Sequence, residues 1–230
     1  MPTEHLFATG AQAAADIATR IATLLAEGIA TRGVASIAVS GGRSPRPVLE
    51  ALSAVDLDWS KVVVTLVDER WVAPDSADSN ERLVRETLLQ GAAAKARFVP
   101  MKNDAADAYA GQAAVEADFA TLPWPLDIIL LGMGDDGHTA SLFPEGKELA
   151  EGLASKALTI AATPPVAPHQ RMSLTAHAIV QSHHIFLQIS GAGKKAVYDR
   201  ALAGGAVEEL PIRLALLQEA VPVEVWIADA

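Results

Sequence analysis

Cysteine is absent from this 230-residue sequence, which excludes disulfide bonds and thiolate metal sites. Aromatic residues make up only 5% of the chain, so we expect a core built mostly from alanine, valine, leucine and isoleucine. Basic residues are also scarce, since 18 Lys and Arg stand against 28 Asp and Glu and give a formal net charge of −10. A surface of that sign repels nucleic acid and anionic membranes, and we expect neither as a partner.

Long apolar runs are missing as well, because none approaches the roughly 20 residues that a membrane-spanning helix requires. The first ten residues, MPTEHLFATG, lack the basic start and the apolar stretch of a secretory signal peptide. Together with the absence of cysteine, these observations predict a soluble protein of the cytoplasm. The length suits a single domain over residues 1–230, long enough to bury a proper core.

Helix and strand patterns alternate along the chain. Strand-like apolar runs occur at residues 35–40, 61–67, 126–131, 185–190 and 223–228. Weaker patterns predict minor strands at residues 97–101, 158–161 and 171–175, and helical spacing marks residues 12–31, 104–121 and 211–219. Ser44 and Pro45 suit the cap and the first turn of a further helix. This alternation predicts an α/β fold with a mainly parallel sheet and helices on both faces.

The segment from residue 126 to 144, LDIILLGMGDDGHTASLFP, joins a buried strand to a polar turn. Glycines permit a tight turn, and here they stand at Gly132, Gly134 and Gly137. Polar groups that would be costly to bury unused are placed among them, at Asp135, Asp136 and His138. A strand that ends in such a loop is where α/β proteins commonly place their chemistry, so this segment is the first candidate site.

The three glycines also match the G-x-G-x-x-G spacing of dinucleotide-binding loops. Two observations argue against that function. Pro144 leaves no room for the long helix that should follow, and two aspartates inside the turn would repel a pyrophosphate. The sequence has neither a GxSxG nucleophile elbow nor a Walker-A pattern. The other histidines lack the spacing of metal ligands, so we expect no metal site.

Four predicted strands end in related polar loops, SGGRSP, DER, GMGDDGH and SGAGK. The carboxyl ends of parallel strands lie along one edge of a sheet, so these loops should converge on one crevice. They supply cations for an anion (Arg43, Arg70 and Lys194) and groups for proton transfer (Asp68, Asp136 and His138). The backbone N–H groups of Gly41 and Gly42 can also face a phosphate. The sequence therefore predicts acid–base chemistry on a phosphorylated small molecule.

In this order, and together with VDERWVAPDSADSN and RMSLT, these motifs resemble the 6-phosphogluconolactonase family over nearly the whole chain. The continuation SLFP after the histidine segment separates the lactonases from their relatives. The resemblance implies a Rossmann-like three-layer sandwich of the type found in glucosamine-6-phosphate deaminase and ribose-5-phosphate isomerase. It also implies hydrolysis of 6-phosphogluconolactone to 6-phosphogluconate, the second step of the pentose phosphate pathway, without metal or cofactor.

The resemblance further implies a role for each matching residue. His138 corresponds to the general base, and Arg70 to the arginine that faces the negative charge developing on the substrate. Asp68 and Asp136 correspond to acidic residues that bind sugar hydroxyls or orient the histidine, with the division between them left open. The remaining substrate-binding positions are Gly41, Gly42, Arg43, Gly137, Arg171 and Lys194. The expected partner is a phosphosugar lactone, and the expected state is a monomer or a weak homo-oligomer.

Several alternatives stay open from sequence alone. Arg70 could simply pair with Asp68 or Glu69, and Lys195 competes with Lys194 for the phosphate. An amino-sugar phosphate deaminase would use the same histidine loop, although an Asn-Glu-Pro-like segment is then expected in place of SLFP. A sugar-phosphate sensor that binds without turnover is the second alternative, but such modules usually accompany a DNA-binding region, for which this acidic chain has no room.

Overall fold

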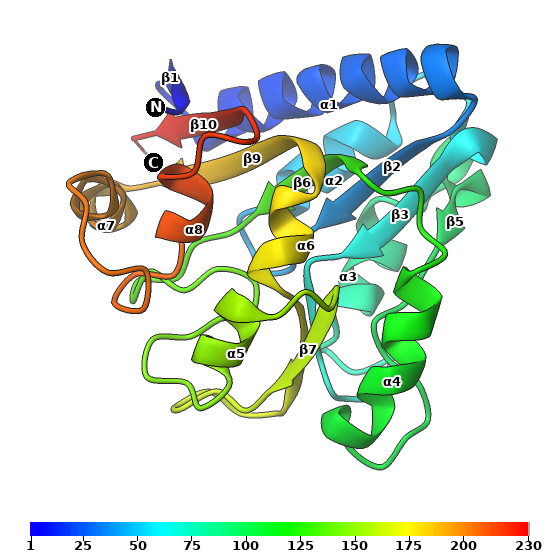
Figure 1. The fold of residues 1–230 in the computed structure, drawn as a ribbon. Coiled ribbons are helices and arrows are strands. Elements are labelled where there is room, and N and C mark those ends of the chain that lie inside the picture. Colours follow the sequence, from blue (N-terminus) through cyan, green and yellow to red (C-terminus); the bar gives the residue numbers. More distant parts are fainter. Residues whose placement is uncertain (230) are drawn as a thin grey trace.

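Seven parallel strands form the central sheet of the protein, described here for residues 1–229 by a computed structural model (Figure 1). Their order across the sheet is β1-β10-β9-β6-β2-β3-β5, and every neighbouring pair is parallel. The strands are β1 (Thr3–Phe7), β2 (Ala35–Val39), β3 (Val62–Leu66), β5 (Arg97–Phe98), β6 (Leu126–Leu131), β9 (Ser182–Ser190) and β10 (Val223–Ala228).

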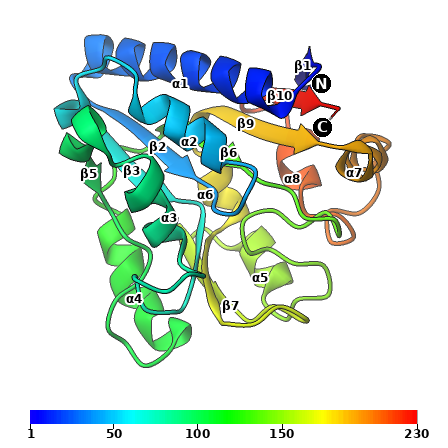
Figure 2. The ribbon, with the colours of Figure 1, turned by 180° about the vertical axis from the view of Figure 1, so that it is seen from behind.

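Helices cover both faces of this sheet, which confirms the predicted fold class. Figures 1 and 2 both show α1 and α2 above the sheet and α6 and α8 below it. Every residue of β2, β3 and β6 is buried, as expected for parallel strands covered on both faces. The α-helices are α1 (Gly10–Arg32), α2 (Arg46–Ser53), α3 (Asn80–Thr87), α4 (Ala108–Phe119), α5 (Leu149–Ala154), α6 (Ala176–Val180), α7 (Ala192–Leu202) and α8 (Arg213–Leu216).

The longest helix, α1, has clear signals at both ends. The Thr9 side chain accepts a hydrogen bond from the backbone N–H of Gln12 at its start. Gly33 ends it in the left-handed conformation, at φ 78°, and its N–H donates to the carbonyl of Ile29. Short 3₁₀ helices lie at Trp59–Lys61 and Gly91–Lys95. No helix within residues 1–229 has the length and apolar content needed to cross a membrane.

A second, three-stranded antiparallel sheet stands below the first, where Figure 1 labels β7. It is composed of β4 (Asp68–Arg70), β8 (Arg171–Leu174) and β7 (Thr159–Ala162), in the order β4-β8-β7. The prediction that DER is a loop was therefore wrong. Three residues are too few to show an alternating pattern, and their partner strand lies far away in the sequence, so only the folded chain reveals the pairing.

Other elements differ from their predicted limits for local reasons. Strand β1 was not predicted, because a polar TEH sequence at a sheet edge, paired only with β10, carries little hydrophobic signal. Ser44 does not cap a helix, since α2 begins at Arg46, after Pro45, and has no side-chain cap. The helix expected at residues 211–219 is limited to Arg213–Leu216. Beyond it, the Gln218 side chain binds the carbonyls of Ala215 and Val221.

The strand order reverses between β2 and β6, because later strands are added on opposite sides of this pair. Strands β3 and β5 continue on one side of β2, whereas β6, β9 and β10 continue on the other. The loops that leave this pair are joined by Ser40, whose N–H donates to the carbonyl of Leu130 (3.0 Å) and whose Oγ accepts from the N–H of Gly132 (2.8 Å). In α/β sheets, a reversal of this kind opens a crevice at the carboxyl ends of the strands.

Candidate active site

A cavity of about 390 Å³ opens at this reversal. Loops after β2, β6 and β9 form one wall, and β4 and β8 of the small sheet contribute to the other. Eight of the ten predicted site residues line it, namely Gly41, Gly42, Arg43, Asp68, Arg70, His138, Arg171 and Lys194. The other two, Asp136 and Gly137, precede His138 in the same turn but are not part of the cavity wall.

The imidazole of His138 is held from two directions. Its Nδ1 lies 2.6 Å from Oδ1 of Asp136, and the same oxygen accepts the backbone N–H of His138 at 3.1 Å. The ring of Phe143 lies against it, with centroids 4.4 Å apart. The carbonyl of His138 accepts the N–H of Gly134 and thereby closes the turn. This turn therefore fixes the orientation of the imidazole at the cavity wall.

Contact with Asp136 determines which nitrogen of His138 carries the proton. The hydrogen bond to His138 lowers the pKa of Asp136, although partial burial acts in the opposite direction. An ionised carboxylate only accepts hydrogen bonds, so Nδ1 of the neutral ring must carry the hydrogen. The lone pair of the neutral imidazole is then on Nε2, the nitrogen that can accept a proton.

Two glycines of the turn are required by packing. A Cβ atom at Gly134 would overlap the His138 ring, so a side chain there would displace the imidazole. Gly137 has φ +79°, a conformation that L side chains rarely adopt, and a Cβ there would overlap Leu210. Gly137 thus supports the shape of the loop from behind, whereas direct substrate contact by this residue stays a prediction.

Arg70 and Arg171 are direct partners across the antiparallel β4–β8 pair. Like charges placed opposite each other are unfavourable unless an anion lies between or beside them. Both Nε atoms are buried without a hydrogen-bond partner. Burial lowers the pKa of Arg171, and the charge of Arg70 lowers it further, while Asp68 acts to raise it. Two neighbouring guanidinium groups in one cavity wall are well suited to hold an anion.

The alternative in which Arg70 is neutralised by its neighbours is wrong. Within residues 1–229, no carboxylate lies within ion-pair distance of Arg70 or Arg171. Nη1 of Arg70 instead donates to the carbonyl of Asp78 at 2.6 Å. That contact orients the guanidinium and leaves its charge available to a ligand.

Asp68 occupies a different environment from Asp136. It is largely buried, and its Oδ2 accepts the hydroxyl of Ser141 at 2.6 Å. The amide of Asn80 donates both to the Asp68 carbonyl (2.8 Å) and to Oδ1 (3.3 Å). Asp68 thus faces the cavity and contacts the segment after the histidine, whereas Asp136 holds the histidine itself.

Glu69 supports the site by binding the start of α3, a role that the sequence did not indicate. Its buried carboxylate accepts hydrogen bonds from the backbone N–H groups of Asn80 and Glu81, each at 2.7 Å, and from the hydroxyl of Ser79 at 3.0 Å. These groups form the start of α3, so Glu69 joins β4 to that helix. Burial raises the pKa of Glu69, while the hydrogen bonds act to lower it. An acidic residue within DER gives no sequence signal of burial.

Lys194 reaches the cavity from the start of α7, and Lys195 does not. Nζ of Lys194 donates to the carbonyl of Met133 and lies 3.5 Å from Oδ1 of Asp135. Nζ of Lys195 binds Asp199 on the same helix at 2.6 Å. The geometry therefore assigns Lys194, and not Lys195, to the cavity.

Sequence reasoning also missed several cavity residues, most of them inside motifs in which other residues were selected. They include Ser40, Asn80, Phe143 and Gln188. Gln188 had a usable signal, because it is a polar residue inside the otherwise apolar run IFLQI near the end of a strand. Its buried Oε1 has no hydrogen-bond partner. Asn80 lies at the first turn of α3 and ends the motif VDERWVAPDSADSN, which could have indicated it.

Comparisons with known proteins agree with these features. A 6-phosphogluconolactonase of Pseudomonas putida is 47% identical over 213 residues, which cover 91% of this chain and 87% of that protein. A crystal structure of a 6-phosphogluconolactonase from Shewanella baltica OS155 superimposes with a TM-score of 0.98 at 42% identity, covering 99% and 98% of the two chains.

A structure described as a monomeric glucosamine-6-phosphate deaminase shares the fold, with a TM-score of 0.82 at 20% identity over 98% of this chain and 97% of that one. The model of the family described as "Glucosamine-6-phosphate isomerases/6-phosphogluconolactonase" matches residues 8–225. The resemblance inferred from the motifs is thus confirmed, and the chain belongs to the glucosamine-6-phosphate isomerase/6-phosphogluconolactonase family.

Proposed function

We propose that this protein hydrolyses 6-phospho-D-glucono-1,5-lactone to 6-phospho-D-gluconate, with His138 activating the attacking water. The observation that carries the proposal is the placement of His138, held through Nδ1 by Asp136, on one cavity with Arg70, Arg171 and Lys194. A base beside a group of cations suits a neutral ester that bears a phosphate. The names of the chain's relatives support the same reaction.

The first chemical step is the addition of water to the lactone carbonyl. Nε2 of His138 takes a proton from the water while its oxygen bonds to the carbonyl carbon, whose π electrons move to the carbonyl oxygen. General-base help of this kind is worth about 10²–10⁴ in rate. Asp136 stabilises the imidazolium that forms, because its carboxylate accepts the Nδ1 hydrogen.

The oxyanion of the tetrahedral intermediate requires a fixed positive group. Arg70 is suited to this role because its guanidinium is oriented by the Asp78 carbonyl and has no carboxylate partner. A preorganised donor is worth about 3 kcal/mol by analogy with other oxyanion holes. When the carbonyl re-forms, the bond to the ring oxygen breaks, and the His138 imidazolium returns its proton to that oxygen. The product is the open-chain acid.

The other end of the substrate carries the phosphate. We assign it to Arg43, Arg171 and Lys194 and to the backbone N–H groups of Gly41 and Gly42. The two acidic residues then have separate tasks. Asp136 orients the histidine, and Asp68, held by Ser141 and Asn80 at the cavity wall, accepts hydrogen bonds from sugar hydroxyls.

We further propose that the protein works in the cytoplasm as a monomer or weak homo-oligomer. A phosphorylated substrate does not cross a membrane unaided, so the enzyme must meet it where it is made. Large exposed apolar side chains within the described residues are few, with Met1 and Leu6 at the N-terminal strand and the others on separate segments, at Tyr109, Val166 and Leu217. Such scattered residues do not form the apolar patch that a stable dimer usually buries.

The test is to follow acid release from freshly generated 6-phosphogluconolactone with and without the protein. Because the lactone also opens spontaneously, the uncatalysed rate is the baseline, and a rate proportional to protein concentration supports the proposal. Ammonia release from glucosamine 6-phosphate would instead identify a deaminase. Binding of 6-phosphogluconate without faster lactone opening would identify a sensor.

A further inference from the structure

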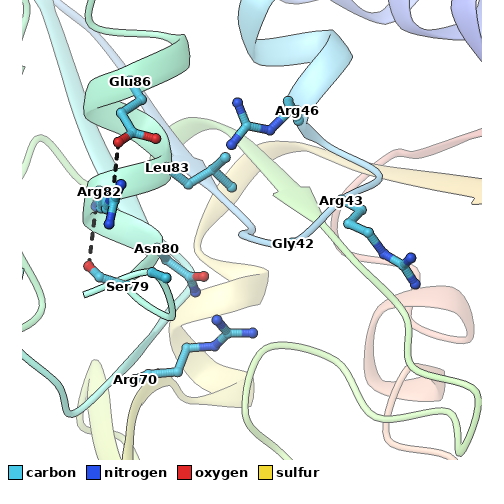
Figure 3. Close-up of a pocket in the computed structure, with 10 residues that line it drawn as sticks. Gly42, Arg43, Arg46, Arg70, Ser79, Asn80, Arg82, Leu83 and Glu86 are labelled. Carbon is cyan, nitrogen blue, oxygen red and sulfur yellow. Dashed lines mark hydrogen bonds and ion pairs between the residues drawn. The ribbon is translucent and has the colours of Figure 1, made fainter. Parts of the chain in front are cut away.

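A second cavity, of about 330 Å³, adjoins the active site (Figure 3). It lies between α2 and α3, and the two cavities share Gly42, Arg43, Arg70 and Asn80 in their walls. Its own residues include Arg46, Ser79, Arg82, Leu83 and Glu86. The motifs of the sequence and the proposed reaction assign no function to this second group.

The wall of the second cavity is strongly basic. Four arginines line it in a chain whose formal net charge is −10. Its one acidic residue, Glu86, is already engaged, since Oε1 accepts the Nε–H of Arg82 at 2.7 Å. Arg46 is held more loosely, with Glu50 at 3.5 Å. A local excess of positive charge on an acidic protein attracts and concentrates anions at that place.

The orientations of the side chains agree with an anion site. In Figure 3, Arg46 extends from α2 toward α3, and Arg70 extends into the same space from below. Arg43 points away from both. Asn80 and Leu83 lie on the α3 side between the two arginines, and Leu83 places an apolar surface next to the positive groups.

We propose that this second cavity binds a phosphate-bearing anion other than the lactone, and that its occupancy slows lactone hydrolysis through Arg70. Arg46 provides the charge that belongs to this cavity alone, because Glu86 offsets the charge of Arg82. Leu83 provides a surface for an apolar part of the ligand, such as the base or ribose of a nucleotide. Either inorganic phosphate or a nucleoside monophosphate has the required chemistry.

Arg70 connects the two cavities. Its Nη1 is bound to the Asp78 carbonyl, its Nε has no partner, and the residue contributes to both walls. A phosphate placed between Arg46 and Arg70 competes with the lactone oxyanion for one guanidinium group. The inhibition should therefore appear in the maximal rate as well as in KM, unlike that of an anion that only occupies the substrate phosphate position.

Binding is tested by titrating the isotopically labelled protein with inorganic phosphate, and separately with adenosine 5′-monophosphate, while recording amide resonances. Resonances of α3 and of the turn at residues 134–139 report the two cavities separately. Arg46→Ala should weaken the α3 response about tenfold, since a hydrogen bond to a charged group is lost. Arg82→Ala should weaken it less, because Arg82 is already bound to Glu86 and to the Asp75 carbonyl. Arg85→Ala removes a charge from the same helix outside both cavities and should leave the α3 response unchanged.

Several outcomes would overturn the proposal. The first is the same α3 response in the wild type, Arg46→Ala, Arg82→Ala and Arg85→Ala. The second is an α3 response that chloride reproduces at matched ionic strength. The third is the absence of any α3 response to phosphate or nucleotide. A stronger response to the nucleotide than to phosphate assigns the Leu83 surface to the base or ribose, and equal responses assign the site to phosphate alone.

The turnover part of the proposal rests on the proposed lactonase activity, whereas the binding part does not. In the wild-type protein, phosphate should lower the maximal rate, and Arg46→Ala should require about tenfold more phosphate for the same inhibition. Inhibition that is purely competitive, or that is identical in Arg46→Ala, would refute the link through Arg70. If the protein shows no lactonase activity at all, the amide titration still decides whether the second cavity binds the anion.

Discussion

The two sheets of this protein contribute to one cavity in different ways. The seven-stranded sheet delivers loops, with the His138 turn after β6, Gly41 and Gly42 after β2, and Lys194 after β9. The three-stranded sheet delivers side chains from within its strands, above all Arg70 and Arg171. The large sheet therefore supplies the base and a glycine-rich backbone, and the small sheet supplies a pair of cations.

The geometry of the large-sheet side depends mainly on residues that are close in sequence, whereas that of the small-sheet side depends on the pairing of distant strands. The turn around His138 is organised by contacts within a few residues, such as those with Asp136 and Gly134. The arginine pair exists only because β4 and β8 align so that residue 70 faces residue 171. A shift by one residue would turn these side chains to opposite faces of the small sheet. Substitutions on the two sides should accordingly have different consequences.

The largest effect is expected on the large-sheet side, for His138→Ala. Turnover should fall about 10²–10⁴-fold, because the general base is lost, while product binding should remain. Rates of lactone opening and titration with 6-phosphogluconate measure the two quantities. The control is His183→Ala, which removes an exposed histidine near the amino end of β9, the end opposite to the active site. Normal turnover in His138→Ala would remove this residue from the mechanism.

On the small-sheet side, Arg70→Ala should lower the maximal rate about 10²–10³-fold, as the loss of an oxyanion donor does elsewhere. Arg70→Lys keeps the charge but lacks the planar fork that binds the Asp78 carbonyl, so it should restore only part of the rate. An effect on KM alone would place Arg70 at the phosphate, beside Arg171, and would assign the whole cation pair to binding.

Much of the large-sheet side was predictable from sequence, and little of the small-sheet side was. Strand β6 was predicted with the limits that the structure shows, because five of its six residues are apolar and glycine follows them. The same pattern placed His138 in a glycine-rich turn at the strand end. Strand β4, in contrast, has three polar residues and owes its conformation to β8 and α3. Asp68 and Arg70 were selected as charged residues at a predicted strand end, the family resemblance supplied their roles, and the pairing with Arg171 was not foreseen.

A smaller effect is expected from the residues assigned to the phosphate. Arg171→Ala and Lys194→Ala should each raise KM about tenfold or more, with less change in the maximal rate, because the charged hydrogen bond that is lost goes to the phosphate, which does not react. Lys195→Ala is the matched control for Lys194→Ala, since Lys195 pairs with Asp199 and lies outside the cavity. Losses confined to the maximal rate would place Arg171 or Lys194 at the chemistry instead.

The smallest effect on turnover is expected from Glu69→Gln, which tests the attachment of the small sheet to α3. Glutamine cannot accept all the hydrogen bonds that the carboxylate receives from Ser79, Asn80 and Glu81, so unfolding should become easier by about 1–3 kcal/mol. Denaturant unfolding of the two proteins measures this difference.

The difference in the free energy of unfolding between the wild type and Glu69→Gln should depend on pH. That dependence shows whether burial or hydrogen bonding dominates the pKa of Glu69. Burial raises the pKa of Glu69 in the folded protein, so the folded state binds this proton more tightly than the unfolded state does. The stability that Glu69 contributes is then complete below its unfolded pKa and declines as the pH rises through its folded pKa. The excess stability of the wild type over Glu69→Gln should therefore decrease as the pH rises from the unfolded pKa of Glu69 to its folded pKa. If it grows instead, the hydrogen bonds from α3 outweigh the cost of burying the charge, and the small sheet is held to α3 by an ionised carboxylate.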